Sequence, residues 1–118
     1  MDIIVSKGVG WSTSAGVFDC IVESTRKLLL VFGEDGVREI YGCYDEQGQA
    51  FIALDSVGMK LFNQFYCCCE RAMKEFPSSE RAAIIPVDHV AGVLWNWSEL
   101  LKLMRADARY FNQLKGSE

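Results

Sequence analysis

Histidine and proline are scarce in this sequence, and long apolar runs are absent. Among 118 residues there are one histidine, His89, and two prolines. Zinc sites are built from several histidine and cysteine ligands with short spacers between them, so we expect no metal site and no cofactor. No apolar run reaches the roughly 18 residues that a membrane-spanning helix needs, and we expect no signal peptide around Met1–Val5. A membrane partner is therefore not expected.

Motifs for catalysis are also missing. Gly8-Val9-Gly10 follows a short apolar segment, but Thr13 stands where a dinucleotide-binding fingerprint has its third glycine. Carboxylate pairs occur only at expected turns, where exposure leaves them with ordinary acidity, and no general acid and base are marked. We therefore expect a protein that is not an enzyme.

The cysteines form an odd set of five, and Cys67, Cys68 and Cys69 are consecutive. Adjacent cysteines do not suit a disulfide framework, so a reducing, cytoplasmic setting is expected. Helical spacing places Cys69 and Cys68 toward the apolar side and Cys67 on the polar side, near Lys60 and Lys74. Those lysines would lower the pKa of the Cys67 thiol, which makes Cys67 the candidate reactive thiol. A tolerated surface cysteine is the alternative.

The charge is unevenly distributed along the chain. The formal net charge is −4, with nine acidic and four basic side chains in residues 1–59 but seven acidic and eight basic ones in residues 60–118. An acidic chain is a poor partner for nucleic acid. Two acidic pairs, Glu34-Asp35 and Asp45-Glu46, lie at expected turns. We interpret them either as ordinary solvated turns or as an acidic surface complementary to a basic partner.

The first half of the chain is expected to form a sheet. A short opening strand and a flexible loop, Gly8–Gly16, come first. Residues 17–32 fit two strands joined near residues 24–27, because they are rich in β-branched side chains; one helix capped by Ser14 is the alternative. Strands separated by turns then predict successive hairpins. The expected strands around these hairpins are 3–5, 28–32, 37–44 and 50–54.

The second half is expected to hold two helices. Residues 56–76 have an apolar stripe at helical spacing, and Pro77 ends it. The stripe consists of Met59, Phe62, Phe65, Tyr66, Cys69, Met73 and Phe76. Residues 82–87 are predicted to form a short edge strand, and Asn96 is predicted to cap a final helix with Glu99 three residues on. That helix is expected to reach Leu114, and the chain to fray from Lys115.

These elements predict one α+β domain over residues 1–118. The expected architecture is an antiparallel β-meander sheet of four to six strands, with the two C-terminal-half helices packed on one face. The other face of the sheet is expected to be solvated, covered by the Trp11 loop, or used for association.

Trp11 and the acidic pairs form the candidate partner-binding set. Trp11 is expected in a loop rich in Gly and Ser, where a large aromatic is hard to bury. Half of all residues are apolar, which suits an interface on the surface of a small protein. An exposed tryptophan beside acidic turns would combine an apolar anchor with a polar rim. The candidate partner-binding residues are Trp11, Glu34, Asp35, Asp45 and Glu46.

The sequence therefore predicts a protein that binds another protein. The leading hypothesis is a small acidic inhibitor or immunity protein, of antitoxin type, that masks a basic partner such as a nuclease toxin. An enzyme or redox sensor that uses Cys67, with His89 as one spatial partner for the thiol, is an alternative. A chaperone-like or adaptor homodimer is another, and a small-ligand module at the Gly8–Gly16 loop is a third.

Overall fold

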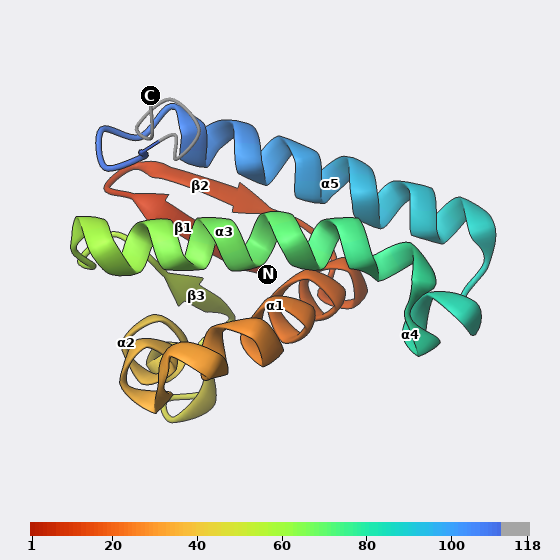
Figure 1. Cartoon of the computed structure of the whole chain (residues 1–118), viewed down its shortest axis with the longest axis horizontal. Coiled ribbons are helices and arrows are strands. Elements are labelled where there is room, and N and C mark those ends of the chain that lie inside the picture. Colours follow the sequence, from red (N-terminus) through yellow and green to blue (C-terminus); the bar gives the residue numbers. More distant parts are fainter. Residues whose placement is uncertain (112–118) are drawn as a thin grey trace.

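The computed structural model describes residues 1–111, which fold around a small sheet with helices beside it (Figure 1). Two of the short segments are 3-10 helices, η1 and η2. In chain order the elements are β1 Asp2–Ser6, β2 Val9–Ser12, α1 Ala15–Leu29, η1 Leu30–Phe32, α2 Glu34–Asp45, β3 Phe51–Ala53, α3 Met59–Glu75, η2 Phe76–Ser78, α4 Glu80–Ala83 and α5 Val87–Arg105.

The sheet has three strands in the order β2-β1-β3. β1 pairs with β2 antiparallel, as a hairpin, and with β3 in parallel, with Ile3 opposite Ile52. The fold is α+β as expected, but the predicted antiparallel meander of four to six strands is wrong. The parallel pair needs a long crossover, and α1 and α2 supply it, because the strands predicted over residues 17–32 and 37–44 are helical. The strands predicted over residues 3–5 and 50–54 are present as β1 and β3.

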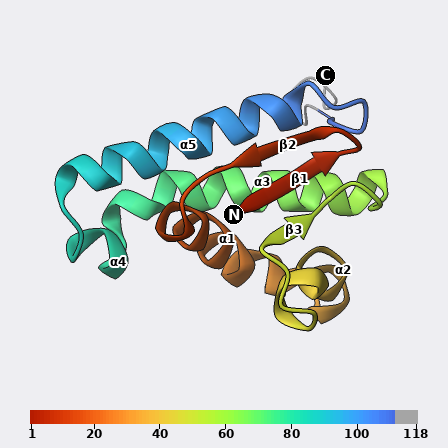
Figure 2. The same ribbon diagram turned by 180° about the vertical axis from the view of Figure 1, so that it is seen from behind.

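The sheet lies against the helices on one side (Figures 1 and 2). α3 crosses the sheet on the side facing the viewer in Figure 1, and the strands stand in front of α3 when the molecule is turned by 180°. Ile3 and Val5 of β1 are fully buried on this side. The opposite side of the β1–β2 hairpin is a shallow hollow that includes Ile4 and Val9, so that side of the hairpin is open to solvent.

α1 overturns the prediction of two strands over residues 17–32. The Ser14 side chain accepts a hydrogen bond from the Val17 amide at 3.4 Å, so the alternative with a Ser14 cap is correct. Three of the β-branched residues that favoured strands, Ile21, Val22 and Thr25, are buried at helical spacing on the side of α1 that packs against α3 and α5. Packing of that face outweighs the β propensity of the segment. The buried residues of α1 are Phe18, Cys20, Ile21, Val22, Thr25 and Leu29.

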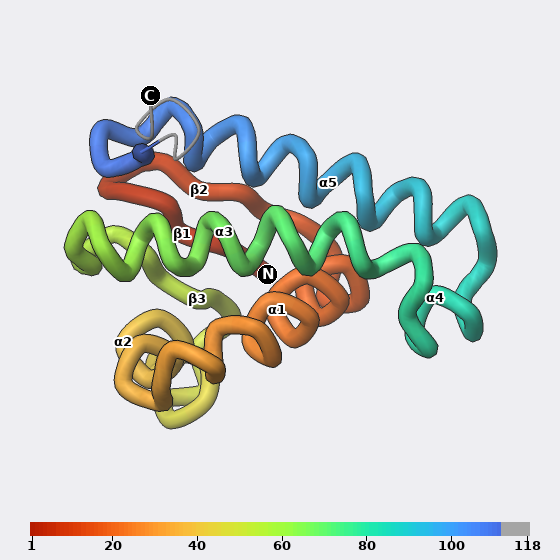
Figure 3. Tube along the Cα trace, viewed as in Figure 1, coloured from red at the N-terminus to blue at the C-terminus, as the bar shows by residue number. Residues whose placement is uncertain are grey.

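α2 replaces the strand predicted over residues 37–44, and the chain path from α1 through α2 to β3 is followed most easily in Figure 3. Its buried residues, Val37, Ile40 and Tyr41, are spaced three and four apart, which is the helical period. Gly36 lets α2 approach α3, because a Cβ there would lie 2.9 Å from the Leu61 Cδ1 atom. Glu34 and Asp35 were predicted to lie in a turn between two strands. In the structure they form the first helical turn of α2.

α3 confirms the helix predicted over residues 56–76, with slightly shorter bounds. Phe62, Phe65 and Cys69 of the predicted stripe are fully buried, whereas Met59 is 59% exposed and lies outside the core. The Trp97 indole N–H donates to the Cys69 Sγ atom at 2.9 Å inside the core. Trp97 is therefore a core residue, whereas Trp95 is 59% exposed.

The strand predicted over residues 82–87 is wrong, as is the helix start at Asn96. Ser79 caps the short helix α4, and α5 begins directly after Pro86, so Asn96 lies within α5. A proline before the first helical turn is tolerated because its missing N–H has no partner there. α5 ends at Arg105, so the predicted helix is wrong for residues 106–111, and its extension from residue 112 on lies outside the described residues. Within residues 1–111, no helix is long and apolar enough to cross a membrane.

Candidate functional site

The structure places Trp11 apart from the acidic residues with which it was grouped. Trp11 lies on β2 beside α5, where its indole N–H donates to the Asn96 Oδ1 atom at 3.2 Å. Its ring packs against Trp95 with centroids 5.9 Å apart. α5 and α2 lie on opposite sides of the molecule in both ribbon views (Figures 1 and 2). Trp11 is half-buried, and its indole N–H is hydrogen-bonded. Because Trp11 lies beside α5 and the acidic residues lie on α2, they do not form one patch.

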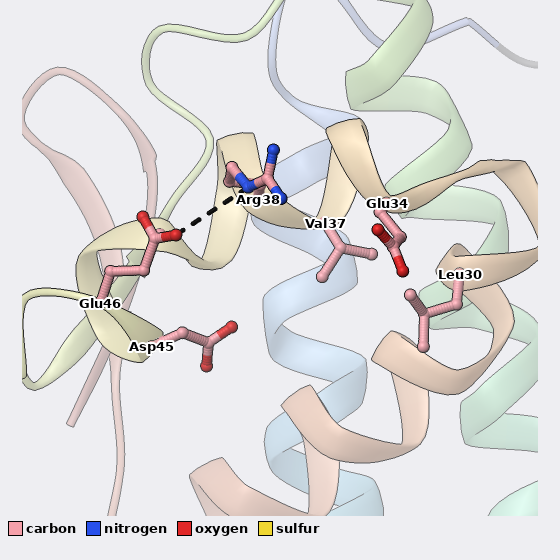
Figure 4. A pocket seen from close by; sticks show the side chains of 7 residues that line it. Leu30, Glu34, Val37, Arg38, Asp45 and Glu46 are labelled. Carbon is pink, nitrogen blue, oxygen red and sulfur yellow. Dashed lines mark ion pairs between the residues drawn. The ribbon is translucent and has the colours of Figure 1, made fainter.

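Three of the four predicted acidic residues line one pocket. This acidic pocket has a volume of about 300 Å³ and runs along the exposed side of α2. Figure 4 shows Glu34 beside Leu30 at one end and Asp45 with Glu46 at the other, with Val37 between them. Asp35 is exposed next to Glu34, and its carboxylate lies 4.0 Å from the Arg38 guanidinium. The pocket is therefore built by α2, by Glu46 directly after it and by Leu30 at the start of η1.

One carboxylate of the pocket is held by an ion pair from α1. The Arg26 guanidinium donates to both carboxylate oxygens of Asp45, at 2.6 and 2.8 Å, and to Glu23 at 3.0 Å. These hydrogen bonds from Arg26 lower the pKa of Asp45. The same guanidinium lies 4.3 Å from the centre of the Tyr41 ring. Asp45 therefore connects α2 to α1 through the ion pair with Arg26, and it also lines the acidic pocket.

The other carboxylates of α2 are loosely held or free. Arg38 lies 3.9 Å from Glu46, the contact drawn in Figure 4, and both side chains are well exposed. Neither Glu34 nor Glu39 forms an ion pair within the described part of the chain. Residues 34–46 hold five carboxylates and one guanidinium, a charge of −4 that equals the net charge of the whole protein. The acidity of the chain is therefore concentrated on α2 and the residue after it.

An apolar groove adjoins the acidic pocket across η1. Phe32 of η1, Met59 of α3 and Phe111 line a groove of about 610 Å³, together with polar side chains of α3. Phe32 and Met59 are each 59% exposed and Phe111 is 51% exposed. Leu30 belongs to the acidic pocket and Phe32 to the groove, so η1 joins the two hollows. We call the acidic pocket, η1 and this groove together the acidic-apolar face.

Cys67 lies in the apolar groove rather than on an open polar surface. Burial and the neighbouring carboxylate of Glu70 raise the pKa of its thiol, which is opposite to the lowering predicted from Lys60 and Lys74. A raised pKa decreases the thiolate fraction at neutral pH and with it the nucleophilicity of the group. Reactivity of Cys67 stays a prediction, and its place beside Phe32 makes the thiol a useful reporter of the groove.

His89 lines a different cavity, of about 390 Å³, where α1, α4 and α5 meet. Cys20 is the cysteine in that cavity, so Cys67 and His89 do not share a site. Arg81 lies there too and forms an ion pair with Asp19 of α1. Burial raises the pKa of the Cys20 thiol. This cavity contains neither an activated thiol nor an unpaired buried charge among the described residues.

The sequence did not identify the apolar half of the face. Residues 28–32 are predicted as a hairpin strand, whereas in the structure they are helical, only Leu29 is fully buried, and Leu30, Val31 and Phe32 of η1 are exposed. One signal was available, because a helix that ends before Gly33 cannot bury five consecutive apolar residues on one face. The approach of Phe111 to Phe32 depends on the tertiary fold and has no signal in the sequence.

No family model and no curated protein matches the sequence. Among solved structures, the fold is similar to that of a chain in the complex of the CdiA-CT toxin from Burkholderia pseudomallei E479 with its cognate CdiI immunity protein. The TM-score is 0.78 at 23% sequence identity, and the match covers 92% of this chain and 96% of the other. A likeness at this identity establishes a shared fold.

Proposed function

We propose that this chain is an immunity-type protein, which binds a protein toxin and blocks it without catalysing a reaction. The observation that carries the proposal is the shared fold: nearly the whole chain matches a chain that belongs to a toxin–immunity complex. In such a complex the inhibitor works by occupying a surface that the toxin needs. A stable surface for binding is sufficient for this role.

The charge of the chain supports the inhibitor's role and a basic partner. The net charge of −4 resides on residues 34–46, on an exposed side of the molecule. Toxins that cleave nucleic acid carry basic surfaces, because phosphate binding depends on Lys and Arg. An acidic inhibitor is steered toward such a surface and competes with the nucleic acid for it. We therefore propose a basic toxin, such as a nuclease acting in the cytoplasm, as the partner.

The test is capture followed by neutralisation. The tagged chain is used to capture proteins from native lysate at low and at high salt, and each captured protein is then expressed with and without this chain. The proposal expects one basic protein that elutes as salt rises, that arrests growth when expressed alone, and that is harmless when this chain is coexpressed. A captured protein whose toxicity is unchanged by coexpression contradicts the proposal.

A charge-matched control separates inhibition from general acidity. The variant Glu80→Gln/Asp88→Asn removes two exposed carboxylates from α4 and α5, at the far end of the molecule from α2 (Figure 1). The variant Glu34→Gln/Asp35→Asn removes two from α2. Both have the same net charge. Neutralisation is expected to survive the first change and to weaken with the second; equal weakening would mean that only the overall charge matters.

A further inference from the structure

We infer that the acidic-apolar face is the surface that binds the toxin, and that its groove receives an apolar side chain from a basic segment of that partner. The inference rests on the proposed function and names the surface and the chemistry of its occupant. Such an occupant presents a Phe- or Leu-sized side chain for the groove, flanked by Lys or Arg for the carboxylates of α2.

Exposed apolar side chains gather on this face. Of the nine large apolar residues that are exposed among residues 1–111, five belong to it. They are Leu30, Val31, Phe32, Met59 and Phe111. They come from three distant parts of the sequence, and Val31 is 82% exposed. Phe32, Met59 and Phe111 line one groove, and exposed apolar groups that gather beside polar ones on a small protein favour a binding surface, because exposing them to water is unfavourable.

The negative charge next to these apolar residues favours a basic occupant. Glu34 follows η1 after one glycine and lines the acidic pocket together with Leu30, so apolar and acidic groups are neighbours. By helical spacing, Asp35 and Glu39 lie on one side of α2 and Glu46 continues that side. Lys60 is the basic residue of the groove. The carboxylates outnumber it, so a partner segment of opposite charge fits better than a neutral or acidic one.

The tryptophan side of the molecule lacks this combination. Trp95 has the same exposed fraction as Phe32, 59%, but its neighbour Trp11 is half-buried and hydrogen-bonded to Asn96. No comparable excess of carboxylates accompanies α5, whose last turn contains Lys102 and Arg105. Trp95 is therefore the matched control for a variant of the groove.

The first experiment uses a probe of the inferred chemistry. A short synthetic peptide with a Phe-Leu pair flanked by Lys and Arg is titrated into the ¹⁵N-labelled protein, and a peptide with Glu in place of Lys and Arg is the control. The basic peptide is expected to shift the amide signals of residues 30–39 and 59–67 in a saturable way. It is also expected to slow the alkylation of Cys67 by iodoacetamide in a Cys43→Ser background. Shifts that cluster around Trp11 and Trp95, or no saturable shifts, overturn the inference.

The second experiment uses the toxin that the wild-type chain neutralises. Phe32→Ser and Met59→Ser are each expected to weaken the complex about 30-fold, the effect of removing a central interface residue. Trp95→Ser, matched in exposure, is expected to change the affinity less than about threefold. Because all three side chains are exposed, the variants should fold, which circular dichroism checks.

The outcomes separate this inference from the proposed function. If the wild-type chain neutralises a toxin but Phe32→Ser binds it as tightly as wild type, the surface is wrong while the function stands. If no captured protein is neutralised, the proposed function fails and the inference fails with it. If Phe32→Ser instead breaks a homodimer observed by sedimentation, a second copy of this chain fills the groove, and the inference is overturned.

Discussion

Two sides of this molecule use aromatic and charged residues in opposite ways. On the α5 side, Trp97 is fully buried with its indole N–H bonded to Cys69, and Trp11 is hydrogen-bonded to Asn96. On the η1–α2 side, Phe32 and the carboxylate of Glu34 remain exposed to solvent. The indole N–H groups of the first side are satisfied internally, whereas on the second side Phe32 is exposed and Glu34 forms no ion pair among the described residues.

The difference separates residues that stabilise the fold from residues that are available for a partner. A side chain that is buried and hydrogen-bonded contributes to the free energy of unfolding, and its loss destabilises the protein. An exposed side chain contributes little to that free energy and is accessible to a partner. Substitutions on the two sides should therefore affect different measurements.

The largest effect is expected at Trp97. Its replacement in Trp97→Ala removes the contact with Phe76, whose ring centre lies 5.6 Å away, and leaves a cavity in the core. We expect the free energy of unfolding to fall by about 4 kcal/mol, measured by urea denaturation. A fall below about 1 kcal/mol would show that the α5 side is not the structural one.

Arg109 is expected to have the next largest effect. Its guanidinium donates to the carbonyl oxygens of Leu54, Val57 and Val5 at 2.6 to 2.8 Å and lies 4.2 Å from the centre of the Phe62 ring. Arg109→Met leaves these carbonyl groups without a donor, and we expect a loss of about 3 kcal/mol. The exposed Arg71→Met variant is the control, for which the urea midpoint should not change.

Stability should also depend on pH in a defined window. Arg26 lowers the pKa of Asp45 and Arg109 lowers that of Asp107, so both carboxylates stabilise the fold above the ordinary pKa of about 4. That contribution is lost as the pH falls through the lowered values. Burial raises the pKa of Cys69 to about 12, so stability should also decline above about pH 9, where the unfolded thiol ionises. Melting temperatures measured from pH 2 to 10 test this pH dependence. A melting temperature that rises on acidification would contradict it.

A smaller effect is expected at Trp11. Trp11→Phe keeps an aromatic ring beside Trp95 but removes the hydrogen bond to Asn96. We expect a loss of about 1 kcal/mol in unfolding free energy. Affinity for the toxin should remain that of wild type, because Trp11 lies apart from α2. A large loss of affinity with unchanged stability would reverse the assignment of the two sides.

The smallest effect on stability is expected at Phe32. The side chain is 59% exposed, so Phe32→Ser should change the unfolding free energy by less than about 0.5 kcal/mol. The same variant is the one expected to weaken the complex most. A destabilisation comparable to that of Trp97→Ala would mean that η1 belongs to the core.

Some elements of the fold were predicted from the sequence and others were not. The helix α3 was predicted because Phe62, Phe65 and Cys69 follow the helical period closely, and the opening strand was predicted from its short apolar run. α1 and α2 were not, because their β-branched residues favour strands locally and only their packing in the tertiary structure makes them helical. The exposed acids of the candidate site were recognised, but their position on a helix was not.

The grouping of residues into a site required the fold. Trp11 and Glu34 were joined because both were expected in exposed loops, yet one lies beside α5 and the other on α2. Phe32, Met59 and Phe111 come together from separate elements, and neither periodicity nor composition indicates that convergence. Local patterns predict which residues are exposed, while the tertiary structure decides which exposed residues are neighbours.

The most direct test is the hydrogen-exchange footprint of the chain in complex with the toxin that it neutralises. The amides of residues 30–39 and of the first turns of α3 should exchange more slowly in the complex, while those around Trp95 should exchange as in the free protein. Protection centred on β2 and α5, with none at η1 and α2, would contradict the assignment of the acidic-apolar face as the binding surface.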